Sequence, residues 1–280
     1  MSVAPKVVLI TGCSQGGIGF SLCQEYAWKG CKVYATARKY DSMEGLEHPN
    51  IKRMILDVTD AHQIEDVVST VITTEGRVDI LVNNAGATLP GPLLDVTLEQ
   101  ARRAFETNTL STLAVCKTVI PHMARRSRGL VINVSSVMGE IPTPWMGLYA
   151  ATKAALHSIT QSLWMECKAF NVEVMLVVPG QVKSNIAVNA HKEYQMPDNS
   201  LYHKYMKNIM HRIAYSQLSG SIPADECARE IVTASLSPEP PRYITLGGAS
   251  TIFRILTWLP RTWVLGYFWR RFTAGVQADR

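Results

Sequence analysis

The chain has 280 residues, of which 47% are hydrophobic and 18% charged, and its formal net charge is +5. Such a composition excludes a disordered protein, which could not bury enough apolar surface to offset its chain entropy. The length fits one domain with one large core, because α/β sheets often run to roughly 250 residues as a single unit. The positive charge raises the question of a nucleic acid or a membrane as partner.

Short apolar runs alternate with helical segments along most of the chain. In chain order, strands are predicted at residues 7–10, 32–37, 54–56, 78–82, 130–134, 172–178 and 243–246. Helices are predicted at residues 20–28, 61–74, about 98–126 with an interruption near Asn108, 149–170 and 223–236. The second helix has one buried face at the i, i+3, i+4, i+7 spacing, formed by Ile64, Val67, Val68 and Val71. Continuous apolar strands separated by helices predict a parallel sheet with helices on both faces.

Residues 181–222 depart from this alternation. They follow the sixth strand, at the sheet edge where ligands bind in folds of this kind, so we expect a substrate lid there. Their three methionines and four tyrosines suit an apolar, adaptable pocket, whose wall Trp145 and Met146 are expected to extend. The three histidines follow no ligand spacing with acidic partners, so no metal site is predicted.

The six cysteines include no CxxC pair and no cysteine–histidine ligand spacing. We interpret them as reduced cysteines of the core and helices. The chain enters its first strand without a charged and then apolar leader, so a cytoplasmic location is expected.

A glycine-rich turn, TGCSQGGIG at residues 11–19, follows the first strand and opens the first helix. Glycines permit a tight turn and let the backbone approach a pyrophosphate at the positive end of the helix. The second strand ends without the carboxylate that would bind an adenosine ribose 2′-OH. Arg38 stands there instead, and its planar fork suits a 2′-phosphate. These features predict NADPH as the cofactor, with a merely solvated Arg38 as the alternative.

Tyr149 and Lys153 are four residues apart and therefore neighbours on one helical face. The Lys153 ammonium is expected to favour the phenolate and so to lower the Tyr149 pKa, which suits a general acid–base. Ser135, at the end of the fifth strand, precedes Tyr149 by fourteen residues. A serine hydroxyl can hold a carbonyl oxygen at which charge develops.

Together these motifs resemble the classical short-chain dehydrogenases/reductases over about residues 5–250. The resemblance rests on the glycine turn, the Tyr149/Lys153 pair, Ser135, Asp57-Val58, Asn83 to Gly86, Asn108 and Pro179-Gly180. The resemblance implies a Rossmann-type reductase domain, and since the sequence shows no linker we expect one domain over residues 1–280, with the lid at 181–222 and a basic aromatic tail at 250–280. It also implies reduction of a ketone or aldehyde, with hydride from the nicotinamide of NADPH.

The resemblance implies four catalytic residues. Tyr149 would donate the proton, and Ser135 would contact the substrate carbonyl. Lys153 would hold the nicotinamide ribose hydroxyls, and Asn108 would complete a water-mediated proton relay with it.

The same resemblance implies a cofactor-binding set. Asp57 and Val58 would contact the adenine, while Asn83 is equally suited to brace the sheet. Four residues separate Gly12 from Gly17 where the family usually has three, so the individual phosphate contacts of the turn stay open. The full set is Gly12, Ser14, Gln15, Ile18, Arg38, Asp57, Val58, Asn84, Gly86, Tyr149, Lys153 and the carboxamide-binding Pro179, Val182 and Ser184.

The longer turn and the sequence ATAR resemble one branch of the family. That branch includes NADPH-dependent 1-acyldihydroxyacetone-phosphate reductases of lipid particles and ketone reductases of fungal secondary metabolism. We therefore expect a hydrophobic carbonyl substrate, either acyl-lipid-like or polycyclic, and a homo-oligomer as is frequent in the family. A catalytically silent, cofactor-sensing interaction protein on the same fold is the alternative from another class.

The net charge lies entirely in the tail. Residues 1–239 carry 22 basic and 22 acidic side chains, whereas residues 240–280 carry six arginines and one aspartate. The neutral body gives no reason to expect nucleic acid as a partner. Pro260 and the arginines interrupt the tail, so it makes a poor membrane-spanning helix. Its three tryptophans suit either a segment lying on a membrane or lipid droplet, through residues 250–272, or an arm packed on its own pocket or a partner subunit.

Overall fold

The computed structural model describes residues 4–276 and contains a seven-stranded parallel sheet. Its strands, in spatial order, are β3 (Ile51–Ile55), β2 (Lys32–Ala37), β1 (Val7–Thr11), β4 (Ile80–Asn83), β5 (Gly129–Val134), β6 (Val172–Pro179) and β9 (Tyr243–Leu246). The order reverses between β1 and β4, which makes the sheet doubly wound and confirms the predicted fold class. A separate pair consists of β7 (Val182–Lys183) and β8 (Ile222–Pro223).

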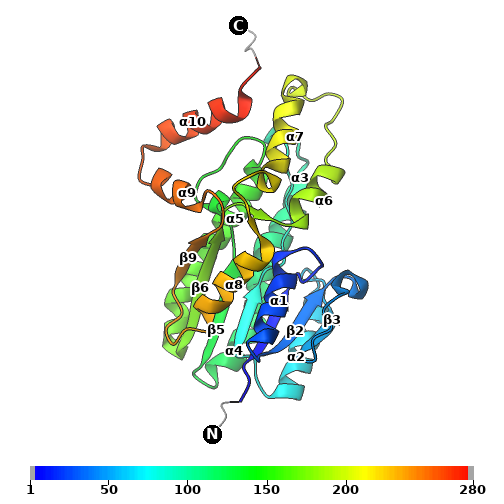
Figure 1. The fold of residues 1–280 in the computed structure, drawn as a ribbon, viewed down its shortest axis with the longest axis vertical. Helices are drawn as coiled ribbons and strands as arrows, with labels where there is room; N and C mark the ends of the chain where they lie inside the picture. The colour runs from blue at the N-terminus through cyan, green and yellow to red at the C-terminus, as the bar shows by residue number, and fades with distance from the viewer. Residues whose placement is uncertain (1–3, 277–280) are drawn as a thin grey trace.

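Helices cover both faces of the sheet (Figure 1). Helices α1 (Ile18–Trp28) and α8 (Ala224–Ser235) pack on one face. Helices α2 (Ala61–Glu75), α4 (Ser111–Ala124) and α5 (Gly147–Glu166) pack on the other. Along β1, Val8 and Ile10 enter the first core, whereas Val7 and Leu9 enter the second. This alternation buries both sides of each central strand, which is why the strands read as continuous apolar runs.

Several predicted elements differ at their ends. The predicted strand at residues 54–56 begins earlier, at Ile51, because β3 is an edge strand whose partly exposed Lys52 and Arg53 conceal its start. The predicted helix at 98–126 is α3 (Leu98–Phe105) followed by α4, with a π-helical turn, η3 (Glu106–Leu110), between them. The interruption predicted near Asn108 is therefore confirmed. Short 3₁₀ turns are η1 (Tyr40–Met43), η2 (Leu93–Asp95), η4 (Val137–Gly139), η5 (Cys167–Phe170), η6 (His203–Tyr205) and η7 (Tyr215–Gln217).

Segment 181–222 and the tail lie beyond the carboxyl ends of the strands (Figure 1). The segment contains α6 (Asn185–Glu193) and α7 (Met206–Ala214), and the tail contains α9 (Ser250–Leu256) and α10 (Arg261–Thr273). A third core joins them, in which Ile209 and Ile213 of α7 pack with Phe268 and Phe272 of α10. The inner face of the tail thus packs on the chain's own body, and residues 277–280 lie outside the described residues.

Trp145 connects the tail to the body. Its backbone has φ 69°, in the left-handed region that is strained for a bulky residue. Its indole Nε1 donates to the carbonyl of Phe272 at 3.2 Å, and its ring lies beside Tyr205 and Trp269. None of the helices that the structure describes within residues 4–276 has both the length and the hydropathy needed to cross a membrane.

Asp79 anchors the amino-terminal ends of the central strands. Its carboxylate accepts hydrogen bonds from the Val7 N–H at 2.9 Å, from Arg77 Nε at 2.9 Å and from Arg126 at 3.2 Å. Burial by itself raises the pKa of Asp79, but the hydrogen bonds from Val7 and Arg77 outweigh burial and the pKa lies below its ordinary value.

We therefore predict that Asp79→Asn lowers the free energy of unfolding at pH 7 by about 1–3 kcal/mol, because charged hydrogen bonds are lost. A carboxylate with a lowered folded-state pKa contributes stability above its ordinary pKa of about 4 and loses it as the pH falls through the folded-state value. The difference between the two proteins should shrink below about pH 4. Urea denaturation at several pH values measures this difference in the free energy of unfolding. The exposed Asp66→Asn is the control, and a loss independent of pH would contradict the role of the charge.

Candidate active site

A continuous cavity of about 990 Å³ opens at the carboxyl ends of the central strands. It begins at the glycine turn and Arg38, passes Tyr149 and Lys153, and ends against Phe272 of the tail. This volume is at the upper end of the range of small-molecule sites. The cavity therefore has room for more than one kind of group along its length.

The glycine turn is built for close backbone approach. Gly12 has φ 74°, and a Cβ atom there would lie 2.6 Å from the Cα of Ala85, so only glycine fits. The amide of Asn84 fixes the turn by donating to the carbonyls of Thr11 and Gly12, both at 2.9 Å. Helix α1 begins at Ile18 with no side-chain cap, so its first N–H groups remain available to an anion.

The additional residue of the turn is held by two neighbouring segments. The Gln15 N–H donates to the Ser42 carbonyl at 2.7 Å, and the Ser14 hydroxyl donates to the Ser42 hydroxyl at 3.1 Å. From α6, the Asn185 amide donates to the Gln15 carbonyl at 2.8 Å. The longer turn is thus an ordered loop, held by hydrogen bonds to η1 on one side and to the start of segment 181–222 on the other.

The structure brings the whole predicted cofactor set to this one cavity. The lining includes Gly12, Ser14, Gln15, Ile18, Arg38, Asp57, Val58, Asn84, Gly86, Tyr149, Lys153, Pro179, Val182 and Ser184. Asn83 does not line it. The Asn83 amide instead donates to Asn133 Oδ1 at 2.9 Å, so this residue braces β4 against β5. The two uses left open for Asn83 are thereby resolved in favour of the sheet.

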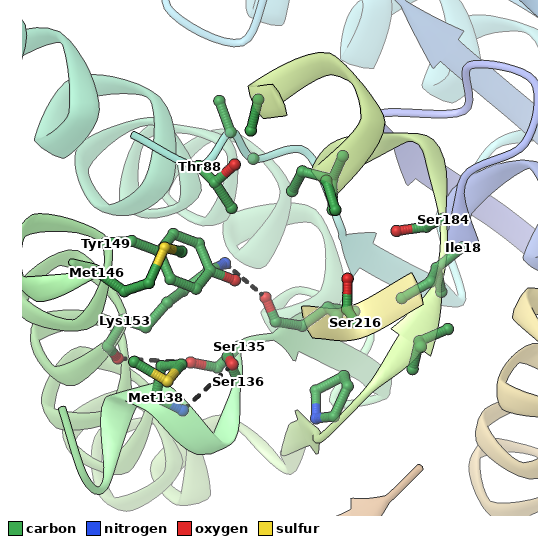
Figure 2. Close-up of a pocket in the computed structure, with 18 of the residues that line it drawn as sticks. Ile18, Thr88, Ser135, Ser136, Met138, Met146, Tyr149, Lys153, Ser184 and Ser216 are labelled. Carbon is green, nitrogen blue, oxygen red and sulfur yellow. Dashed lines mark hydrogen bonds between the residues drawn. The ribbon is translucent and has the colours of Figure 1, made fainter. Parts of the chain in front are cut away.

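Tyr149 and Lys153 project from α5 toward the carboxyl end of β5 (Figure 2). Lys153 is buried, and its ammonium donates to the Val134 carbonyl at 3.1 Å. Burial lowers the pKa of Lys153 to about 8. The ammonium lies 5.8 Å from the centroid of the Tyr149 ring, so the pair shares one face of α5 as predicted.

The predicted lowering of the Tyr149 pKa by Lys153 is wrong for this arrangement. Burial raises the pKa of Tyr149 to about 12, opposed by a hydrogen bond with Ser136 and by the positive charge of Arg212. The physical reason is desolvation, because a phenolate in this buried position would lose its water. At neutral pH the Tyr149 hydroxyl therefore keeps its proton.

The serine beside Tyr149 is Ser136, and the role expected of Ser135 toward a substrate carbonyl stays a prediction. The Ser135 hydroxyl donates to the Lys153 carbonyl at 3.4 Å (Figure 2), whereas Ser136 lies close enough to Tyr149 to oppose the rise of its pKa. Ser135 still follows the extended course of β5, since its N–H donates to the Val177 carbonyl, so consecutive side chains take different directions. Both serines line the cavity. The two adjacent serines and the end of the strand at Val134 were visible in the sequence, but not the direction that each serine side chain takes.

Asn108 is buried in the π-helical turn η3. Its Oδ1 accepts from the Ala87 N–H at 2.8 Å, and its Nδ2 donates to the Ala87 carbonyl and to the Thr152 hydroxyl. A Cβ atom at Gly86 would lie 3.2 Å from Asn108 Oδ1 and 3.6 Å from Lys153 Nζ, so both groups face that glycine. The side chain is fully hydrogen-bonded in the structure, and its role in a proton relay stays a prediction.

Sequence reasoning missed the residues that close the far end of the cavity. Arg212 of α7 and Arg271 of α10 line it together with aromatic residues of the tail. Met146 lines it as predicted, but Trp145 lies behind the wall. Within residues 4–276 there is no cluster of three or more histidine, cysteine, aspartate or glutamate side chains that could hold a metal ion.

Comparison with known proteins gives a consistent picture. The short chain dehydrogenase family model matches residues 6–195. A short-chain dehydrogenase of Penicillium crustosum is 35% identical over 229 residues, covering 81% of this chain and 83% of that protein. The NADPH-dependent 1-acyldihydroxyacetone phosphate reductase of Schizosaccharomyces pombe is 34% identical, with 74% and 71% covered. Among solved structures, a short-chain dehydrogenase from Streptomyces avermitilis matches with a TM-score of 0.80 and 28% identity, covering 98% of this chain and 96% of that one.

Proposed function

This chain belongs to the short-chain dehydrogenase family, a family of oxidoreductases, and on that premise we propose that it reduces a hydrophobic ketone or aldehyde with NADPH. One observation carries the proposal. A partly buried tyrosine that keeps its proton, a serine hydroxyl and a buried ammonium lie together in a cavity that also contains an uncapped helix terminus. The chain presents a proton donor and a dinucleotide site in the same cavity.

The residues of the cavity fit a dinucleotide. The start of α1 and the Gly12 turn suit the pyrophosphate, since the backbone N–H groups there lack a side-chain cap. Lys153 and the space at Gly86 suit the nicotinamide ribose, and Pro179, Val182 and Ser184 lie where the carboxamide would be held. When bound, NADPH supplies the hydride that the carbonyl carbon accepts.

The protein's own groups would handle the proton. Tyr149, with a pKa of about 12, holds its proton at neutral pH and can deliver it to the carbonyl oxygen. The adjacent Ser136 hydroxyl can hydrogen-bond that oxygen while negative charge develops on it, a role we assign to Ser136 in place of Ser135. The charge of Arg212 favours the phenolate that remains. Intact Tyr149, Ser136 and Lys153 speak against a catalytically silent sensor.

The walls of the inner cavity support an apolar substrate. Met138, Met146, Phe253, Leu256 and Phe268 line it. Either an acyl lipid or a polycyclic ketone would bury apolar surface there. Reduction of a 1-acyldihydroxyacetone phosphate is the second candidate, and the similarity to the Schizosaccharomyces pombe reductase favours it.

The outer face of the tail supports contact with a membrane or a lipid droplet. Arg254, Arg261 and Arg270 accompany a group of exposed apolar side chains there, namely Ile255, Trp258, Leu259, Trp263 and Leu265. A combination of exposed aromatic, aliphatic and cationic side chains is typical of segments that lie in the membrane interface. A second copy of this chain, as in a homo-oligomer, is the alternative occupant of this face.

The reductase proposal predicts separate effects for three variants. Tyr149→Phe should lower kcat by about 10²- to 10⁴-fold, because the proton donor is lost, while the Kd for NADPH stays the same. Ser136→Ala should lower kcat/KM more than Ser135→Ala does. NADPH oxidation is followed with acyl, steroid-like and aromatic ketones. A fully active Tyr149→Phe protein would refute the proposal. A larger loss of kcat/KM in Ser135→Ala than in Ser136→Ala would show that Ser135 contacts the substrate carbonyl.

The assignment of NADPH predicts a preference that depends on Arg38. The wild-type kcat/KM should be higher with NADPH than with NADH. Arg38→Ala should reduce that ratio by about ten- to a hundred-fold, because a charge-assisted hydrogen bond to the 2′-phosphate contributes roughly 1.5–3 kcal/mol. Lys117→Ala, an exposed cation of α4, is the control. A wild-type preference for NADH would overturn this assignment.

The membrane proposal predicts that exposed tail side chains govern binding to lipid. The double variant Ile255→Ser with Trp258→Ser should bind anionic liposomes about tenfold or more weakly, because each buried apolar side chain contributes roughly 1.5–3 kcal/mol. Trp28→Ser, an exposed tryptophan of α1, is the matched control. Co-sedimentation measures binding, and sedimentation velocity reports the oligomeric state. Unchanged recovery contradicts the proposal, and dissociation of an oligomer favours the second copy.

A further inference from the structure

Arg212 is a buried cation at the inner end of the cavity. Only 9% of its surface is exposed, although arginine side chains normally reach water. Its Nε donates to the Thr143 hydroxyl at 2.9 Å, and its Nη2 lies 3.1 Å from the Met138 sulfur. The planar guanidinium also lies 5.1 Å from the centroid of the Phe272 ring. The group is therefore held in one orientation by neutral neighbours.

No acidic side chain neutralises this charge. Among residues 4–276, every ion pair between an arginine or lysine and a carboxylate involves residues other than Arg212. Burial lowers the pKa of Arg212 to about 10, so it stays charged at neutral pH. Buried charges without a partner are costly, and proteins usually pair them. A buried cation facing an open cavity is thus missing an anionic partner.

A second cation approaches the same place from the tail. Arg271 of α10 donates to the Tyr215 hydroxyl at 2.7 Å, and the Arg212 guanidinium lies 5.6 Å from the centroid of the same ring. Both arginines and Tyr215 line the cavity. The acidic residues of the lining, Asp57 and Glu106, belong to β3's end and to η3. The tail and α7 therefore bring two positive charges to one apolar wall.

We propose that Arg212, assisted by Arg271, binds a carboxylate or phosphate group of an otherwise apolar carbonyl substrate. The proposal rests on the reductase function proposed above and adds the chemical class of its substrate, an anionic amphiphile. A guanidinium matches the paired oxygens of either anion through two parallel hydrogen bonds. The apolar part of the substrate would lie along Met146, Phe253 and Phe268, near Tyr149.

Two other uses of Arg212 make different predictions. If Arg212 served only to favour the Tyr149 phenolate, its removal would slow neutral and anionic substrates equally and shift the pH profile of kcat. If it served only to hold α7 in place, its removal would lower the Tm and weaken every ligand equally. Selective loss of anionic ligands is expected only from direct binding.

The test is a binding titration that needs no turnover. Decyl phosphate, decanoate and 1-decanol are titrated into the full chain, with the fluorescence of Trp145 and its neighbours or calorimetry as the readout. The wild type should bind at least one anion about tenfold or more tightly than the alcohol. Arg212→Met should lower the ratio of the alcohol Kd to the anion Kd by about ten- to a hundred-fold, as expected for a lost charge-assisted hydrogen bond. Arg212→Lys, which keeps the charge without the fork, should retain part of it.

The control is Lys207→Gln, which removes an exposed cation from the same helix. Its anion preference should equal that of the wild type. A wild type that binds the alcohol as tightly as both anions would overturn the inference, and so would equal weakening of all three probes in Arg212→Met. Should the protein prefer anions yet oxidise no NADPH with any carbonyl, the reductase proposal would fail while the anion site stands.

Discussion

The hydrogen bond from the Lys153 ammonium to the Val134 carbonyl is the constraint on which the site depends. It ties the first half of α5 to the last residue of β5. The Ser135 hydroxyl adds a second tie in the opposite direction, to the Lys153 carbonyl. Tyr149 lies one turn before Lys153 on α5, so the same tie places its hydroxyl near Ser136. The buried Lys153 ammonium, which would be costly without a partner, thus fixes the position of the Tyr149 side chain.

The same sheet edge supports the cofactor end of the cavity by a different means. There the backbone itself is the ligand surface, and the amide of Asn84 holds it by bonding two carbonyls of the turn. Glycine is required at position 12 because the turn passes within contact distance of Ala85, in the segment that follows β4. The polar groups of the cavity therefore lie at the carboxyl edge of the sheet and on the first half of α5, whereas much of the apolar wall comes from segments added beyond the sheet.

Much of this arrangement could be predicted from the sequence because it follows from local periodicity. Apolar runs located the central strands, and a spacing of four placed Tyr149 and Lys153 on one helical face. The choice between Ser135 and Ser136 could not be predicted, because both follow the end of β5 at Val134 and it depends on the direction that each side chain takes there. Arg212 was missed for another reason. In an amphipathic nine-residue helix, an arginine reads as a solvated side chain, and only packing against distant segments, at Thr143 and at Phe272 of α10, buries it.

The order of the walls along the chain has a consequence for synthesis. The sheet strands β1 to β6 and the site residues of α5 all precede residue 180, but the apolar wall that carries Phe253, Phe268 and Phe272 comes last. At a translation rate of about 5–20 residues per second, the apolar wall is therefore synthesised several seconds after the strands and α5. Until then the cavity stays open on that side. During that interval the interior is an apolar trough, open to chaperones and to lipid, which α9 and α10 cover when they dock on α7 and Trp145.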